Sequence, residues 1–233
     1  MKSLYDIHGL MFWDQSQIVA REKLIVDISQ SLFNLFTDIN RAWIFKRVEA
    51  PLLMPKHLLN KNYTEEDIWT TDNNLCLRPE TTPGSFVAAK HLLNITQPPL
   101  CVWQAGKSFR KEQHDKSYIH MSLDEFWQME FQFMYSENTK ADYMNIVCER
   151  LPQIIETILC PYLQYPEEPE MLKIIESDRL PSYSSKTMDL EIFNGHKMLE
   201  VCSISQRQDF NHNNLQVLEI AFGLDRLVSL LWT

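Results

Sequence analysis

The sequence is poor in glycine and has no long apolar run. It contains 5 glycines in 233 residues, and neither GxGxxG nor GxxxxGK occurs. Glycine-rich loops that cradle phosphates are therefore excluded, and a bound nucleotide must be held by side chains. No apolar stretch approaches the ~18 residues that a membrane-spanning helix needs, and the N-terminal region contains acidic residues and no apolar segment typical of a secretion signal. We therefore expect neither membrane spanning nor secretion.

The sequence also lacks paired cysteines and a positive net charge. The five cysteines form no CxxC pair, which argues against a disulfide framework and a metal knuckle and favours a reducing cytoplasm. The net charge of −9, from 22 basic and 31 acidic side chains, disfavours a protein that coats nucleic acid. A locally basic pocket stays compatible with that charge. The length suits one well-buried domain, which we expect to span residues 1–233.

The spacing of apolar residues predicts an α+β domain. Helical spacing marks residues 15–39, 81–93, 142–163 and the segment from residue 223 onward, and strand-like runs cover 43–53, 100–111, 124–135, 187–193, 198–204 and 215–222. Turns rather than regular crossover helices join these runs, so we predict an antiparallel β-sheet flanked by helices instead of a Rossmann layout. The acidic segment 161–185 contains four prolines and is expected to be a surface excursion.

Alternation along residues 124–135 separates an apolar face from a polar one. The polar face carries Phe126, Gln128, Glu130 and Gln132. A single phenylalanine among polar groups suits stacking against a flat ligand. The alternative is a solvated face with one stray aromatic side chain, which is common.

The strand over residues 100–111 ends beside a basic loop. Arg110 and Glu112 point to the same side, and the loop that follows contains Lys111, Lys116 and His120. An Arg–Glu pair at this spacing could be a plain surface ion pair of little energetic weight. A basic loop inside an acidic chain, however, suits a polyphosphate.

Two carboxylates occupy the middle of predicted strands. Glu200 and Glu219 both have apolar neighbours along the chain. Burying a carboxylate without a partner is costly, so each needs a cation, either an arginine or Mg²⁺.

Taken together, these segments resemble the three signature motifs of class II aminoacyl-tRNA synthetases. Residues 47–53 (RVEAPLL), after a long helix, are similar to motif 1, and residues 223–226 (GLDR) are similar to motif 3. Residues 106–112 (GKSFRKE), a loop and residues 125–132 (EFWQMEFQ) resemble motif 2. Two further blocks, residues 77–86 (LRPETTPGSF) and 199–210 (LEVCSISQRQDF), resemble the glycyl-tRNA synthetase branch.

The resemblance implies an ATP site. Arg110 would contact the α-phosphate and the substrate carboxylate, and Glu112 would accept a hydrogen bond from the adenine amino group. Phe126 and Arg226 would sandwich the adenine ring. Arg110 and Arg226 are thus the expected catalytic residues.

The resemblance also implies a metal site and an amino-acid site. Glu200 and Glu219 would hold Mg²⁺ between phosphate oxygens. Glu80, Glu130 and again Glu219 match a carboxylate cage that binds the small ammonium group, with Arg78 beside them.

Three features depart from the family pattern. Ser122 stands where motif 2 usually has an Arg or His that grips the ATP tail, and Lys116 or His120 are the candidate substitutes. Ala221 stands where glycyl enzymes place a serine. The chain ends seven residues after Arg226, so an anticodon-binding domain is not expected.

The leading hypothesis is ATP-dependent activation of a glycine-like amino acid to an aminoacyl-adenylate, with release of pyrophosphate. The acceptor would be tRNA or another molecule, and tRNA binding by this chain alone is expected to be weak. A non-catalytic paralogue, serving as a regulatory or polymerase-accessory subunit, is the alternative, and a histidyl- or threonyl-like specificity is a third. The resemblance further implies a homodimer built on motif 1.

Overall fold

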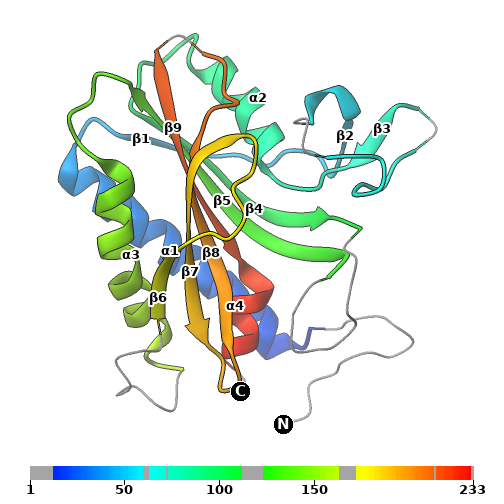
Figure 1. Ribbon diagram of the computed structural model, residues 1–233, viewed down its shortest axis with the longest axis vertical. Helices are drawn as coiled ribbons and strands as arrows, with labels where there is room; N and C mark the ends of the chain where they lie inside the picture. The colour runs from blue at the N-terminus through cyan, green and yellow to red at the C-terminus, as the bar shows by residue number, and fades with distance from the viewer. Residues whose placement is uncertain are drawn as a thin grey trace.

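The computed structural model describes residues 13–59, 63–71, 73–111, 123–162, 172–212 and 214–231. They form a seven-stranded sheet with helices on both faces (Figure 1) and a small two-stranded sheet beside it. The strand order of the large sheet is β1-β4-β5-β9-β8-β7-β6. Its strands are β1 (Ile44–Arg47), β4 (Leu100–Phe109), β5 (Glu125–Ser136), β6 (Leu172–Glu176), β7 (Ser184–Phe193), β8 (Met198–Arg207) and β9 (Leu215–Gly223). The helices are α1 (Gln15–Ile39), α2 (Thr82–Leu92), α3 (Tyr143–Leu159) and α4 (Leu224–Leu230).

The predicted antiparallel α+β architecture is confirmed, with one parallel pair at the edge. All neighbouring strands of the large sheet run antiparallel except β1, which pairs parallel with β4. The single strand expected over residues 43–53 is two: β1, and β2 (Leu53–Pro55) of the small sheet. Pro51 lies between them and has no N–H to donate to a ladder.

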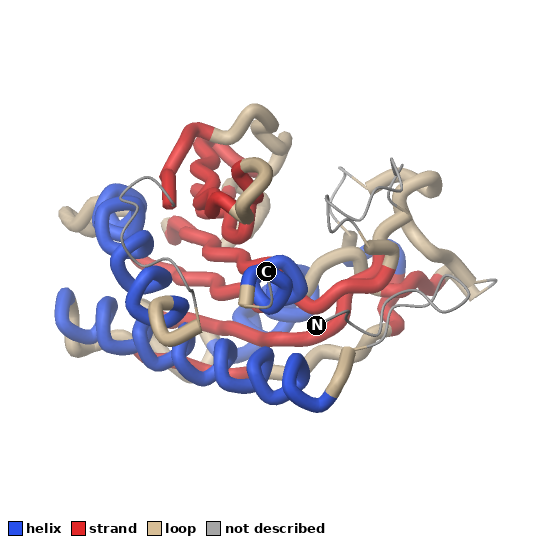
Figure 2. The backbone as a smooth tube through the Cα atoms, turned by 90° about the horizontal axis from the view of Figure 1, so that it is seen from below, coloured by secondary structure: helices blue, strands red, loops and turns tan. Residues whose placement is uncertain are grey.

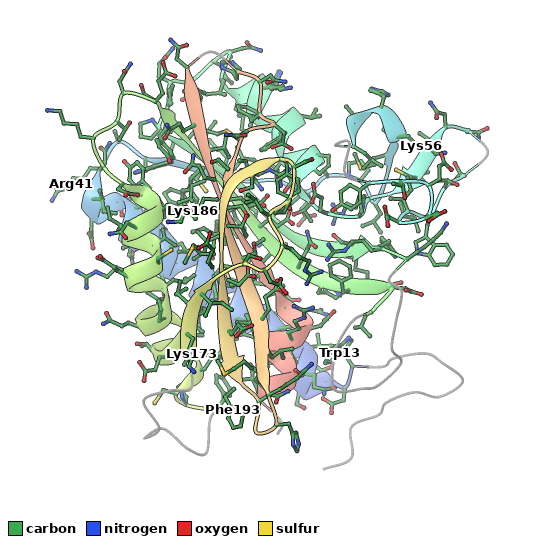
Figure 3. All side chains as sticks on the ribbon, in the orientation of Figure 1. Trp13, Arg41, Lys56, Lys173, Lys186 and Phe193 are labelled. Carbon is green, nitrogen blue, oxygen red and sulfur yellow. The ribbon has the colours of Figure 1, made fainter. Side chains whose placement is uncertain are left out.

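The sequence did not predict two short strands, β3 (Leu75–Leu77) and β6. In the small sheet β2 pairs with β3, and a 3-10 helix, η1 (Lys56–Leu58), follows β2. This unit lies to one side of the large sheet, where Lys56 marks it in Figure 3. The segment 161–185, expected as a surface excursion, contributes the edge strand β6 to the large sheet, while residues 163–171 lie outside the described residues. The expectation of an excursion was therefore wrong for β6, whose alternating Leu172 and Ile174 pack against the main core.

The opening helix begins and ends as its sequence dictates. Asp14 caps α1 by accepting a hydrogen bond from the Gln17 backbone N–H, and the Gln17 side chain accepts one from the Asp14 N–H in return. One face of α1 is buried, and its Phe36 ring stacks on Phe133 of β5 with the ring centroids 3.8 Å apart. Trp43, at the entry to β1, meets the Phe36 ring edge-on at 5.1 Å. This aromatic cluster anchors α1 to the centre of the sheet.

One face of the large sheet packs in the main core, and the other is largely polar. Helices α1, α3 and α4 supply the main core together with one side of the strands, and Figure 2 shows α1 and α3 as a layer on one side of the strands. On the opposite face α2 covers only a small apolar cluster that includes Leu100 and Val102 of β4 and Met134 of β5. Farther along that same face the side chains become polar, beginning with Gln104 and Gln132. The open, polar part of this face is where a ligand site can form.

Within the described residues no helix is both long and apolar enough to cross a membrane.

The aromatic anchor of α1 predicts a large stability effect. We expect Phe36→Ala to lower the free energy of unfolding by ~3–5 kcal/mol, because the fully buried ring leaves a cavity against Phe133 and Trp43. Asn34→Ala, an exposed position on the same helix, should change it by less than ~0.5 kcal/mol. Urea denaturation of both variants measures the difference, and equal effects would contradict the assignment of this cluster to the core.

Candidate active site

A cavity of about 350 Å³ opens on the polar face of the sheet. Strands β5, β8 and β9, the start of α4 and the segment between β6 and β7 contribute to its walls. The predicted site residues among its lining are Glu80, Arg110, Phe126, Glu130, Glu200, Glu219 and Arg226. Arg78 is not among them. Glu112, Lys116 and His120, together with Ser122, lie outside the described residues.

A β-bulge aims Glu200 into this cavity. Leu190 of β7 pairs with Cys202, but the next residue, Glu191, pairs with Glu200, so Val201 is an extra residue in β8. The bulge reverses the alternation of β8 at this point. Leu199 therefore faces the main core while Glu200 shares the site face with Ser203, although a regular strand would send Glu200 to the core with Cys202.

Three buried glutamates converge deep in the cavity. Glu80 accepts a hydrogen bond from the Tyr63 hydroxyl at 2.8 Å, and Glu219 accepts from the Gln132 amide at 2.6 Å. Glu130 accepts from the Thr81 hydroxyl at 2.6 Å and from the Gln128 amide. Each of the three is no more than 6% exposed. We call Glu80, Glu130 and Glu219 the carboxylate cluster.

The hydrogen bonds of Thr82 need one more donor than the side chains supply if all three carboxyls are ionised, so one of these carboxyls carries a proton. Thr82 Oγ1 lies 2.9 Å from Glu130 Oε2 and 2.7 Å from Glu219 Oε2, and it accepts from Gln132 Nε2 at 2.9 Å. A hydroxyl has one hydrogen and cannot donate to both carboxylates. Glu219 also accepts a hydrogen bond from the Arg207 guanidinium, whereas Glu130 forms no ion pair within the described part of the chain. The proton therefore belongs on Glu130.

The electrostatic surroundings agree with this placement. Burial, together with the negative charges of Glu219 and Glu80, raises the pKa of Glu130 to about 8. Burial also raises the pKa of Glu80, although the nearby Arg207 acts in the opposite direction.

Arg207 is the cation that faces the cluster. Its Nη1 donates to Glu219 Oε2 at 2.7 Å, its Nη2 lies 3.7 Å from Glu80 Oε1, and it forms two hydrogen bonds with Asp209. The guanidinium lies 3.9 Å from the centre of the Tyr183 ring. Burial by itself would lower the pKa of Arg207, but the three carboxylates raise it well above its usual value. This side chain therefore stays charged while fully buried.

Arg78 does not line the cavity; it binds backbone groups of the neighbouring segments. Its guanidinium donates to the backbone carbonyls of Lys107 and Ala50, both at 2.7 Å, and to Gln104 Oε1 at 3.1 Å. It also lies against Gly106, where a Cβ would be 2.3 Å from Nη2. The glycine in this strand is thus required by close approach of an arginine, and Arg78 fixes β4 next to the cluster.

The other half of the cavity carries Phe126 and two arginines. The Arg110 guanidinium lies over one face of the Phe126 ring, 4.6 Å from its centre. Arg226 donates to the Glu200 backbone carbonyl at 2.8 Å, and its Nη1 lies 3.6 Å from Glu200 Oε2. Arg110, Phe126 and Arg226, expected to bind ATP, therefore line one cavity together with the carboxylate cluster.

The expected Mg²⁺ ligands fit the metal unequally. Glu219 Oε2 already accepts from Thr82, Gln132 and Arg207, so that oxygen is committed to protein donors. Glu200 is more exposed and faces the cavity, which suits a carboxylate that shares Mg²⁺ with phosphate oxygens. Among the described residues no group of three or more His, Cys, Asp or Glu side chains is arranged to hold a metal ion by itself.

Several site residues were not assigned from the sequence. Thr81 and Thr82 lie inside the block 77–86, and Arg207 and Asp209 lie inside the block 199–210, but only the tertiary contacts reveal what they do. A signal for Arg207 was present, since a lone arginine near the end of a mostly uncharged strand needs a buried acid as partner. Tyr63 had no signal, because its partner Glu80 lies on a different element.

Arg110, Phe126, Arg226 and the carboxylate cluster thus lie in one cavity on the polar face of an antiparallel sheet. The sequence profile described as "tRNA synthetases class II core domain (F)" matches residues 31–160, and the chain belongs to this family.

Curated relatives are glycine–tRNA ligases. The one from Mycolicibacterium paratuberculosis is 30% identical over 156 residues, which cover 63% of this chain and 32% of the relative. The one from Staphylococcus saprophyticus is 30% identical over 206 residues, covering 87% of this chain and 39% of the relative. The chain thus spans 32% to 39% of the length of these relatives.

Solved structures confirm the fold. A pyrrolysyl tRNA synthetase from Desulfitobacterium hafniense superposes with a TM-score of 0.62 over 91% of this chain and 66% of its own, at 18% sequence identity. At that identity the likeness concerns the fold alone.

The proton on Glu130 predicts a pH-dependent stability. Because its folded pKa of about 8 lies above its ordinary value of 4.5, the neutral carboxyl stabilises the fold at low pH, and this contribution is lost as the pH rises from about 4.5 through 8. Glu130→Gln keeps a neutral donor beside Thr82 at every pH. We expect the free energy of unfolding of Glu130→Gln, relative to wild type, to rise with pH between 5 and 8 by up to ~1.4 kcal/mol per pH unit.

Chemical denaturation at several pH values measures this trend. Glu137→Gln, an exposed glutamate just beyond β5, is the matched control and should show no trend. A flat difference for Glu130→Gln would contradict the proton assignment.

Proposed function

We propose that this chain activates an amino acid with ATP, forming an aminoacyl-adenylate and releasing pyrophosphate. The observation that supports this most strongly is the meeting of two unlike half-sites in one cavity. One half offers cationic and aromatic groups, Arg110, Phe126 and Arg226, and the other offers the carboxylate cluster. A phosphate-bearing nucleotide suits the first half and an ammonium group suits the second.

The proposed reaction is an in-line displacement at the α-phosphorus of ATP. A carboxylate oxygen of the amino acid forms the new P–O bond, and the bond from the α-phosphorus to the bridging oxygen breaks, so the electron pair leaves with pyrophosphate. Negative charge grows on the α-phosphate oxygens in the transition state. Arg110 lines the cavity next to Phe126 and is the group assigned to stabilise that charge.

The nucleotide base is assigned to Phe126 and Arg226. Arg110 already covers one face of the Phe126 ring, so adenine would take the exposed part of the ring, with Arg226 opposite it. Mg²⁺, when bound with ATP, would neutralise phosphate charge, and Glu200 is the residue proposed to share it. Glu219 is proposed to belong to the amino-acid half and not to the Mg²⁺ site, since its Oε2 accepts hydrogen bonds from Arg207, Thr82 and Gln132.

The amino-acid half favours a small amine. Glu130 and Glu219 share Thr82 as a neighbour, and Glu219 and Glu80 share Arg207, so the three carboxyl groups lie close together. A compact ammonium group fits such an enclosure, which supports a glycine-like substrate, in keeping with the relatives' names. A non-catalytic binding subunit would have no need of both halves.

The acceptor and the cellular location belong to this proposal, because the chain spans only part of the length of its relatives. We propose tRNA or another molecule as acceptor, with weak tRNA binding through these residues alone, since the chain carries a net charge of −9. The five cysteines are all free thiols, which supports a reducing, cytoplasmic location.

Apolar side chains on α1 support a homodimer. Val19, Val26 and Phe33 are exposed and spaced by seven residues, so they share one side of the helix. Phe33 meets Phe45 of β1 at 5.0 Å, which extends this surface onto the edge strand. A second copy of the chain would bury it.

The activity is tested by glycine-dependent exchange of labelled pyrophosphate into ATP. We expect exchange by the wild-type chain and a fall of ~10²-fold or more for Arg110→Ala, because the lost contact strengthens as charge develops. Arg41→Ala, an exposed arginine next to α1, should retain full exchange. A panel of the twenty amino acids shows the specificity, and an absence of ATP binding at millimolar nucleotide in calorimetry would overturn the proposed activity.

The assembly is tested by light scattering at micromolar concentration. We expect the mass of a dimer for the wild type and of a monomer for Val26→Asp, because a charge in an apolar interface is left unpaired. Leu180→Asp, at an exposed apolar residue between β6 and β7, should remain dimeric. A monomeric wild type would exclude the α1 interface.

A further inference from the structure

The floor of the cavity is formed where β9 ends between two longer neighbours. The β5–β9 ladder stops at the pair Gln128–Gly223, and the β8–β9 ladder stops at Cys202–Phe222. Beyond these points the chain turns into α4. Strands β5 and β8 continue past the end of β9, and their backbone groups there have no strand between them to bond.

The first charged residues of α4 satisfy those groups with their side chains. Asp225 accepts a hydrogen bond from the Trp127 backbone N–H of β5 at 2.7 Å. Arg226 donates to the Glu200 backbone carbonyl of β8 at 2.8 Å. The pair Asp225–Arg226 therefore extends β9 by side-chain hydrogen bonds in place of a further stretch of strand.

This arrangement gives Asp225 a role that the family resemblance did not assign. Trp127 directly follows Phe126, so fixing the Trp127 N–H fixes the backbone from which the Phe126 ring projects. Asp225 is 4% exposed and its carboxylate is charged or neutral according to a pKa that burial raises to about 6. In either state one carboxyl oxygen can accept the bond, so the contact persists across this range.

We propose that Asp225 is a positioning residue for the nucleotide half of the cavity: it holds β5 at the spacing from α4 and β8 that places Phe126 opposite Arg226. This inference rests on the proposed ATP site. The Arg21 guanidinium, 3.9 Å from the centre of the Trp127 ring, supports the same residue from α1 but contacts its side chain rather than its N–H. On its other edge β5 is paired with β4 as far as Phe109–Glu125, so Asp225 holds the edge of β5 that faces α4 and β8.

Two substitutions at Asp225 separate the hydrogen bond from the volume. Asp225→Asn keeps an oxygen that accepts from Trp127, whereas Asp225→Leu keeps the bulk and removes the acceptor. Leu227→Ala is the matched control, because it removes a fully buried side chain from the same helix but, being apolar, no hydrogen bond to either strand. It reports what general loosening of α4 does.

The first measurement is hydrogen exchange of the Trp127 backbone amide by nuclear magnetic resonance in the full chain. We expect protection in the wild type and in Asp225→Asn, and exchange at least ~10-fold faster in Asp225→Leu. The second is calorimetric binding of Mg²⁺-ATP and, separately, of glycine. ATP affinity should fall at least ~10-fold in Asp225→Leu and stay within ~2-fold of wild type in Asp225→Asn and Leu227→Ala, with glycine affinity unchanged throughout.

Each outcome decides the inference. Equal losses of ATP affinity in Asp225→Asn and Asp225→Leu, or an equal loss in Leu227→Ala, would overturn the positioning role. An unprotected Trp127 amide in the wild type would overturn the hydrogen bond itself. If the wild type binds no ATP, the proposed function fails and the nucleotide part of this inference fails with it, while the exchange measurement still decides whether Asp225 holds β5.

Discussion

The ion pair between Arg207 and Glu219 is the interaction on which the site depends. Three carboxyl groups cannot share a buried space as three anions, because each would raise the free energy of the others in a medium of low polarity. Arg207 supplies one full positive charge at 2.7 Å from Glu219 and 3.7 Å from Glu80. The proton on Glu130 removes a second negative charge. The cluster is therefore tolerated because one cation and one proton offset part of its negative charge.

The surroundings of Arg207 explain why it can serve in this way. Its flat guanidinium lies between the rings of Tyr183 and Phe86, at 3.9 and 5.3 Å, and Asp209 takes two of its donors. The Nε, Nη1 and Nη2 atoms each donate to a carboxylate, and a flexible lysine could not make the same set of contacts. Phe86 belongs to α2, and Tyr183 belongs to the segment before β7. Through these two rings Arg207 also links α2 to that segment.

The fold and the alternation of its central strands could be read from the sequence. The bounds of α1 agree with the periodicity of its apolar residues, and the apolar and polar faces of β5 are divided as the alternation of Met129, Glu130 and Phe131 predicts. Strand β6 was missed because it lies in a proline-rich, acidic segment whose strand character depends on pairing with β7. The small β2–β3 sheet was missed for a similar reason: three-residue strands leave no periodic pattern, and they exist because they pair.

The sequence by itself determined the order of the elements, the face of each regular strand that turns to the core, and the candidates Glu80, Arg110, Phe126, Glu130, Glu200, Glu219 and Arg226. These depend on local periodicity and on motifs a few residues long. Only the tertiary structure decided which groups are partners. It assigned Arg78 to backbone carbonyls, placed Arg207 and Thr82 among the glutamates, and turned Glu200 toward the cavity by a bulge at Val201. The reason is physical: a protonation state or an ion pair depends on distances between side chains from elements far apart in the chain, and these distances are set when the sheet assembles.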